Sequence, residues 1–254
     1  MTYYELEDLK HVAELPYNWD ILTNKRIVIS GGTGFIGSFF CDVIRYRNKI
    51  YHQNIKVVSI SFRQYKDDDT VTYVKSDICK SIDIEGNVDY ILHLASNTHP
   101  EQYKTDPVGT ITGNVFGAYN LLTLAKEKQS LKFVLASSCE IYGDGIDEPM
   151  DELCCGYINS NTARAGYNES KRVSESLCQS FAQQYGIESC VFRLARVFGV
   201  DRTKIDSKAM AQFIRNAVEG NDIVLKSKGH QKYSYVYISD AVSGIIAVLL
   251  NGKP

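Results

Sequence analysis

An apolar, β-branched run breaks into glycines and then resumes with helical periodicity in the stretch RIVISGGTGFIGSFF, residues 26–40. Three of its glycines form a G-x-x-G-x-x-G pattern: Gly31, Gly34 and Gly37. In such a corner the first glycine permits a tight turn, the second lets backbone N–H groups approach a diphosphate, and the third lets the helix lie close to the strand. A helix that begins with Phe35 and Ile36 directs its positive end at the phosphates. The stretch therefore predicts a strand–turn–helix unit that binds a dinucleotide.

Apolar runs alternate with helical patterns along most of the chain. We expect strands near 26–30, 55–61, 71–75, 89–95, 132–138 and 189–194, and helices near 35–49, 107–128, 162–185, 207–219 and 240–251. This order is typical of an α/β protein with a Rossmann, doubly wound parallel sheet covered by helices on both faces. We expect an N-terminal appendage (1–24), a dinucleotide-binding Rossmann domain (25–195) and a small C-terminal substrate-binding lobe (196–254).

Composition argues against several other classes of protein. The net charge is −2, and the charged residues, 23% of the chain, form no basic face that would bind nucleic acid. No window holds the roughly 18 apolar residues of a membrane span, and the acidic N-terminus is unlike a signal peptide. The seven cysteines fall at irregular spacings that do not suit a zinc site. We therefore expect a cytoplasmic protein with reduced thiols and with no metal, nucleic-acid or membrane partner.

A second group of residues suits proton transfer. Tyr167 and Lys171 are four residues apart, so they share one face of the helix expected near 162–185. The ammonium can lower the pKa of the phenol, which is otherwise a poor base near neutral pH, and can also reach a ribose. Ser138, at the end of a strand, would hydrogen-bond the same substrate oxygen as Tyr167. These residues predict acid/base catalysis at a carbinol while hydride moves to a nicotinamide.

The end of the second expected strand bears on the choice of dinucleotide. An acidic residue at this place would bind both ribose hydroxyls of NAD. The chain instead has Ser61, with Arg63 two residues further on. A hydroxyl and a guanidinium suit a 2′-phosphate, so of the two cofactors, NAD and NADP, the sequence favours NADP.

Several segments together resemble the NAD-dependent epimerase/dehydratase family, the nucleotide-sugar-modifying branch of the extended short-chain dehydrogenases/reductases. They are GGTGFIG, HLASNTHPEQY, LASSCEIYGD, TARAGYNESKRVSESLCQSFAQQYGI and RLARVFG. The resemblance spans roughly residues 25–250 and is most marked toward the UDP-glucuronate decarboxylases, with dTDP-glucose 4,6-dehydratases as further members.

The resemblance implies further contacts for the cofactor and the substrate. Asp77 and Ile78 match a contact with the adenine, and Ala95 and Ser96 would flank the cofactor. Asn114 matches the family's helical asparagine, although an asparagine in a helix can also mark a bend or make an interhelical hydrogen bond. On the substrate side the matching residues are Glu140, which would act at the sugar, Arg164 and Arg202.

The chain also departs from the family's pattern at three places. Cys139 stands where the 4,6-dehydratases carry an aspartate. Arg202 comes one residue later than the family's arginine, and Tyr233 replaces another arginine that would grip the diphosphate or a sugar carboxylate.

The family resemblance implies an enzyme that oxidises C4 of a nucleotide-activated hexose to a 4-keto intermediate. Epimerases, decarboxylases and dehydratases share this step, and the motifs do not choose among them. An NADPH-dependent 4-keto-sugar reductase and a non-catalytic dinucleotide-binding protein are the alternatives. The resemblance further implies a homodimer formed through the helices near 107–128 and 162–185, and a C-terminal lobe some tens of residues longer than 196–254.

Overall fold

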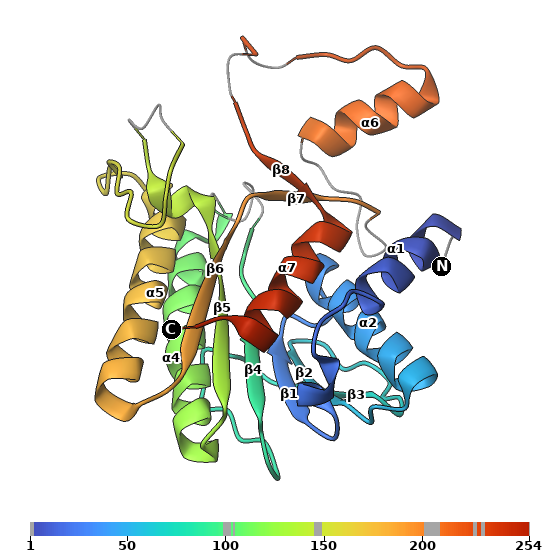
Figure 1. Ribbon diagram of the computed structural model, residues 1–254. Coiled ribbons are helices and arrows are strands. Elements are labelled where there is room, and N and C mark those ends of the chain that lie inside the picture. Colours follow the sequence, from blue (N-terminus) through green and yellow to red (C-terminus); the bar gives the residue numbers. More distant parts are fainter. Residues whose placement is uncertain are drawn as a thin grey trace.

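The computed structural model describes residues 3–98, 103, 105–144, 149–200, 209–225, 228–229 and 232–253. Its centre is a six-stranded sheet in the order β3-β2-β1-β4-β5-β6, with each neighbouring pair parallel (Figure 1). The strands are β1 (Arg26–Ser30), β2 (Lys56–Ser61), β3 (Val71–Lys75), β4 (Tyr90–His93), β5 (Lys132–Ser138) and β6 (Ser189–Leu194). This confirms the predicted doubly wound Rossmann fold, whose reversal point lies between β1 and β4.

Helices cover both faces of the sheet (Figure 1). The helices α1 (Tyr3–Ala13), α2 (Phe35–Tyr51) and α7 (Ile238–Asn251) pack on one face, and α4 (Pro107–Lys128) and α5 (Ala165–Tyr185) pack on the other. Successive side chains of β1 divide between these layers, because Ile27 and Ile29 join the first core and Val28 the second. Strands β4 and β5 are buried along their whole length, as strands covered on both faces must be.

Local signals fix the start of α4 and the end of α5. The Asp106 side chain caps α4 by accepting a 2.9 Å hydrogen bond from the Gly109 N–H, and Pro107 suits the first helical position. Helix α5 ends at Gly186, whose φ of +70° is the left-handed conformation common after helices. These ends set the two helices side by side over one face of the sheet.

The N-terminal appendage consists of α1 and the short 3₁₀ helix η1 (Trp19–Leu22). It is tied to α2 through the buried guanidinium of Arg47, which lies 4.7 Å from the ring centroid of Trp19 and 3.8 Å from that of Tyr51. The same group donates a 3.0 Å hydrogen bond to the carbonyl of Ala13. The segment ahead of β1 is thus part of the packed structure.

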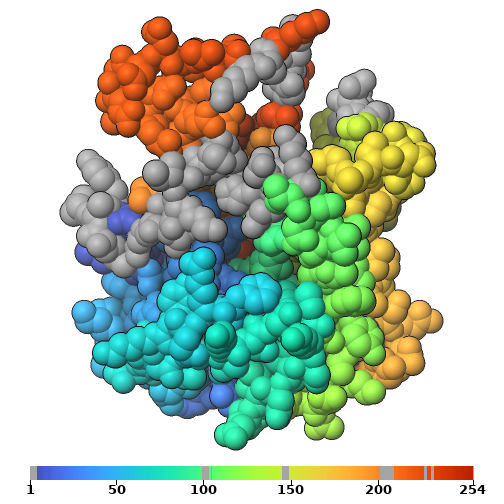
Figure 2. Space-filling model, turned by 180° about the vertical axis from the view of Figure 1, so that it is seen from behind, coloured from blue at the N-terminus to red at the C-terminus, as the bar shows by residue number. Residues whose placement is uncertain are grey.

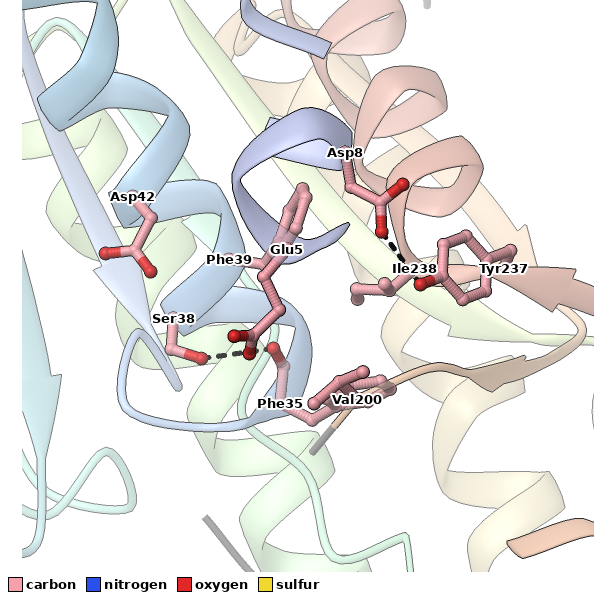
Figure 3. A pocket seen from close by; sticks show the side chains of 9 residues that line it. All are labelled: Glu5, Asp8, Phe35, Ser38, Phe39, Asp42, Val200, Tyr237 and Ile238. Carbon is pink, nitrogen blue, oxygen red and sulfur yellow. Dashed lines mark hydrogen bonds between the residues drawn. The ribbon is translucent and has the colours of Figure 1, made fainter. Parts of the chain in front are cut away.

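The appendage also meets the last helix of the chain. Tyr17 Oη donates to the carbonyl of Ser243 at 3.2 Å, and Tyr237 Oη donates to the Asp8 carboxylate at 2.8 Å. A small pocket lies at this junction (Figure 3), lined by Glu5, Asp8, Phe35, Ser38, Phe39, Asp42, Val200, Tyr237 and Ile238. It touches the first turn of α2 but includes none of the residues predicted to transfer protons.

The C-terminal range divides into two parts. The strands β7 (Arg196–Phe198) and β8 (Tyr235–Tyr237) form a parallel pair, and α6 (Ala209–Glu219), which buries none of its residues, lies at the periphery of the molecule (Figures 1 and 2). In contrast, α7 buries an apolar face that includes Val242 and Ile245 in the core of the sheet. Within the part of the chain that the structure describes, no helix is both long and apolar enough to span a bilayer.

Candidate active site

The glycine corner between β1 and α2 is too crowded for side chains. Gly31 has a φ of +78°, and a Cβ there would lie 2.8 Å from the backbone nitrogen of Ala95, just beyond β4. A Cβ at Gly37 would meet the backbone of Gly31, and it would lie 2.7 Å from the Cα of Gly32. Glycine at these two places therefore allows the loop, the end of β4 and the first turn of α2 to pack together.

The corner has the chemistry that a diphosphate requires. The N–H groups at the start of α2, at Phe35, Ile36 and Gly37, have no preceding helical carbonyl to bond, and they add to the positive end of the helix dipole. Gly34 donates to the carbonyl of Gly31 at 2.9 Å, which closes the turn ahead of these groups. The residues present thus fit the diphosphate of a dinucleotide.

The residues expected near the adenosine lie just beyond β2 and β3. Ser61 Oγ donates a 2.5 Å hydrogen bond to the carbonyl of Arg63, whose side chain is exposed. The Asp77 carboxylate accepts a 2.9 Å bond from the N–H of Cys79. The Ile78 side chain is buried beneath α4, and its carbonyl accepts a bond from Asn120. Any adenine contact of Ile78 would therefore come from its backbone.

Asn114 is buried and bonded at both ends of its amide. Ser96 Oγ donates to its Oδ1 at 2.7 Å, and its Nδ2 donates to Ser170 Oγ at 2.9 Å. It thus makes the interhelical hydrogen bond that the sequence allowed as an alternative, joining α4 to α5. This bond connects the loop after β4 with the helix that carries the next group of residues.

Ser138, Tyr167 and Lys171 come together beside the end of β5. Tyr167 and Ser138 are both buried, and the Ser138 hydroxyl lies close enough to the phenol to lower its pKa. Ser138 Oγ also accepts a 3.2 Å bond from the N–H of Glu140. Lys171, one helical turn after Tyr167, donates a 2.8 Å bond to the carbonyl of Ala136.

The electrostatics of the pair correct one expectation. The sequence predicts a Tyr167 pKa lowered by Lys171, but in the structure burial raises the pKa of Tyr167, while the Ser138 hydroxyl partly opposes the rise. Burial also lowers the pKa of Lys171, to about 8, since the buried ammonium loses its hydration. For both side chains, the loss of hydration therefore changes the pKa more than the neighbouring charges do.

The polar groups on the substrate side are held by α5 and the 3₁₀ turn η2 (Cys139–Tyr142). Arg164 forms a 2.7 Å ion pair with Glu140 and donates to Asn168, also at 2.7 Å. Tyr233, which replaces a family arginine, lies with its ring 3.5 Å from the guanidinium carbon of Arg196. Arg202 lies outside the described residues.

The sequence reasoning missed three residues of this region. Tyr103 packs against Tyr167, Ser170 bonds Asn114, and His93 shares a 2.6 Å hydrogen bond with Ser30. His93 begins and Tyr103 ends the quoted segment HLASNTHPEQY, but their spacing carries no periodic signal. Ser170 immediately precedes Lys171, and only the packing of α5 on α4 shows what it does.

The sheet order, the glycine corner and the polar groups at the carboxyl edge together define an α/β protein of the Rossmann dinucleotide-binding class. The model of the NAD dependent epimerase/dehydratase family matches residues 27–254. The chain belongs to this family.

Named relatives within the family are similar over most of the chain. UDP-glucuronic acid decarboxylase 1 of Xenopus tropicalis is 33% identical over 232 residues, which cover 89% of this chain and 53% of that protein. UDP-glucuronic acid decarboxylase 5 of Arabidopsis thaliana is 34% identical over 234 residues, covering 89% of this chain and 67% of the relative. The chain thus spans about half the length of the Xenopus protein.

Solved structures show the same fold. The dTDP-glucose 4,6-dehydratase of Streptomyces venezuelae, solved with NAD bound, superposes with a TM-score of 0.75 at 24% identity, over 90% of this chain and 73% of its own. The UDP-glucuronic acid 4-epimerase of Bacillus cereus, solved with UDP-glucuronic acid and NAD, gives a TM-score of 0.70 at 21% identity, over 90% and 74% of the two chains.

Proposed function

We propose that this chain carries the catalytic site of an enzyme that oxidises C4 of a nucleotide-activated sugar to a 4-keto intermediate. The observation that carries the proposal is the burial of the Tyr167 phenol beside Ser138, one helical turn from Lys171. Membership of the epimerase/dehydratase family supports it.

Each residue then has a defined task. Tyr167 accepts the proton of the C4 hydroxyl, and Ser138 holds the same oxygen through its hydroxyl. Lys171 supplies positive charge beneath the phenol and can turn from the Ala136 carbonyl toward a ribose. The bound nicotinamide supplies the hydride acceptor. Once a ketone has formed at C4, Glu140 is the carboxylate positioned to act on the sugar.

The substrate class follows from the relatives and from Arg164. The similar proteins are named as UDP-glucuronic acid decarboxylases, so UDP-glucuronic acid is the first substrate to test. In the structure Arg164 is paired with Glu140 and half-exposed. A sugar carboxylate would compete with Glu140 for this guanidinium. The lobe proposed to cover the sugar comprises β7, α6 and β8.

For the cofactor we propose NADP over NAD, on the strength of Ser61 and Arg63. The Arg63 side chain is exposed beside β2, where a 2′-phosphate would lie. The same feature favours a second candidate function, a 4-keto-sugar reductase that consumes free NADPH. A purified protein without bound nucleotide that turns over NADPH would favour the reductase.

We further propose that the chain forms a homodimer through α4 and α5. These helices expose apolar side chains in neighbouring turns: Val108, Ile111, Phe116 and Tyr119 on α4, and Val173 on α5. Phe116→Glu should convert a dimer into a monomer in light scattering, whereas a wild-type monomer would contradict the proposal. All seven cysteines are free, which supports the proposed cytoplasmic location.

Two measurements test the proposed reaction. Mass spectrometry of the purified protein should identify a co-purifying dinucleotide. Incubation with UDP-, dTDP-, GDP- and CDP-sugars should then yield a 4-keto product or a product derived from it. A protein that binds no dinucleotide and changes none of these sugars would overturn the proposal.

A further inference from the structure

A second phenol, that of Tyr103, lies directly against the proposed acid/base group. The Tyr103 residue is only 9% exposed, and its ring centroid lies 4.9 Å from that of Tyr167, with the ring planes tilted by 32°. This is the spacing of a packed aromatic pair. Tyr103 comes from the segment after β4, so two separate parts of the chain bring these rings together.

Arg164 restrains this pair. Its guanidinium carbon lies 4.9 Å from the ring centroid of Tyr103, close enough for a cation–π contact. The ion pair with Glu140 and the hydrogen bond to Asn168 fix the guanidinium in turn. A chain of packed side chains therefore runs from η2 through Arg164 and Tyr103 to Tyr167.

The neighbouring phenol also affects the titration of Tyr103. Burial first, and then the proximity of Tyr167, raise the pKa of Tyr103 well above its ordinary value, so its hydroxyl keeps its proton. A phenol that stays protonated beside a phenolate is a hydrogen-bond donor to it.

We infer that Tyr103 is a positioning residue for the proposed reaction: its ring orients Tyr167, and its hydroxyl donates a hydrogen bond that, with Ser138, stabilises the Tyr167 phenolate. The catalytic part of this inference rests on the proposed function. The phenol pair itself does not, so the two can be tested separately.

The phenol pair can be tested by NMR of protein labelled at the ζ-carbon of tyrosine, at neutral pH and without substrate. Loss of one resonance in Tyr167→Phe assigns the Tyr167 signal. Tyr103→Phe keeps the ring and removes only the hydroxyl, so the Tyr167 signal should move. Tyr185→Phe, the same change in an exposed tyrosine at the far end of α5, should leave it in place. An unmoved Tyr167 signal in Tyr103→Phe would overturn the inference.

The positioning role is tested on the enzyme with its bound dinucleotide and the sugar that it turns over. In Tyr103→Phe the acidic limb of the kcat profile should move up by about one pH unit, because the phenolate has lost a donor, and kcat at neutral pH should fall about tenfold with KM nearly unchanged. An unchanged profile would refute the role even if the NMR signal moves. A chain that shows the NMR shift but acts on no sugar would refute the proposed function and leave the phenol pair standing.

Discussion

Ser30 and His93 share a 2.6 Å hydrogen bond between Oγ and Nδ1, across the paired ends of β1 and β4. Ser30 Oγ also accepts a 3.2 Å bond from the N–H of Ala95. These bonds fix the end of β4 against the glycine corner. His93 Nε2 is buried and bonds no partner among the residues that the structure describes, so the imidazole sits in a site that disfavours its charged form.

His93 makes the fold sensitive to acid. Burial, aided by the positive charge of Lys171, lowers its pKa from 6.5 to about 3. Between these two pH values the unfolded chain binds more protons than the folded one, so the free energy of unfolding falls as pH falls, with a slope of up to about 1.4 kcal/mol per pH unit from this group. We expect urea unfolding between pH 7 and pH 4 to show a shallower decline in His93→Asn.

The control for this change is His52→Asn, because His52 is exposed and its left-handed conformation accepts asparagine. In His52→Asn the free energy of unfolding should fall with pH as steeply as in wild type. An equal slope in His93→Asn and wild type would show that His93 does not govern the acid response.

Removing the proposed acid/base hydroxyl should separate chemistry from binding. Tyr167→Phe keeps the buried ring, so we expect turnover to fall about 10²-fold or more while the dinucleotide affinity, measured by calorimetry, stays near that of wild type. Tyr185→Phe should change neither quantity. Wild-type turnover in Tyr167→Phe would remove the assigned role.

Arg63 should discriminate between the two dinucleotides. Because its guanidinium is proposed to meet a 2′-phosphate, Arg63→Ala should weaken NADP binding roughly 10-fold or more and leave NAD binding almost unchanged. Titration of both dinucleotides against both proteins measures the difference. Equal losses for NAD and NADP would contradict the choice of NADP.

The glycine corner offers a matched pair of substitutions. Gly31 and Gly86 share a φ of +78°, but a Cβ at Gly31 would press on the Ala95 backbone, whereas at Gly86 it would meet only the end of the Arg26 side chain. Gly86→Ala should lower the free energy of unfolding by about 1 kcal/mol, because alanine disfavours this backbone conformation. Gly31→Ala should lower the free energy of unfolding by about 3 kcal/mol and should also weaken dinucleotide binding. Similar costs at both sites would show that the close approach is unimportant.

Sequence patterns located nearly every strand of the sheet and nearly every helix that covers it. Each element buries a defined face, and that face appears in the sequence as a periodic pattern of apolar residues. The differences are local. Helix α5 begins at Ala165 and not near 162, since Thr162 and Ala165 first close hydrogen-bonded turns. Beyond the last expected strand, the described residues contain two further short strands, β7 and β8, which pair with each other. A parallel pair of three residues has no pattern strong enough to predict.

The spatial grouping of the candidate site residues was predicted where it depends on spacing along the sequence. The spacing of Tyr167 and Lys171 placed both on one helix, and the strand end placed Ser138 beside them. The sequence could not show that Tyr103 covers Tyr167, or that Asn114 is satisfied by Ser96 and Ser170, because these contacts depend on how α4, α5 and the segment after β4 pack. It also misjudged the Tyr167 pKa, which depends on burial that no spacing reveals.

The bonds from Tyr17 to Ser243 and from Tyr237 to Asp8 join positions 226 and 229 residues apart in the chain. The segment that holds Asp8 and Tyr17 therefore gains these partners only after all six strands of the central sheet have been synthesised. During synthesis the sheet can assemble first, and the docking of this segment onto β8 and α7 comes later.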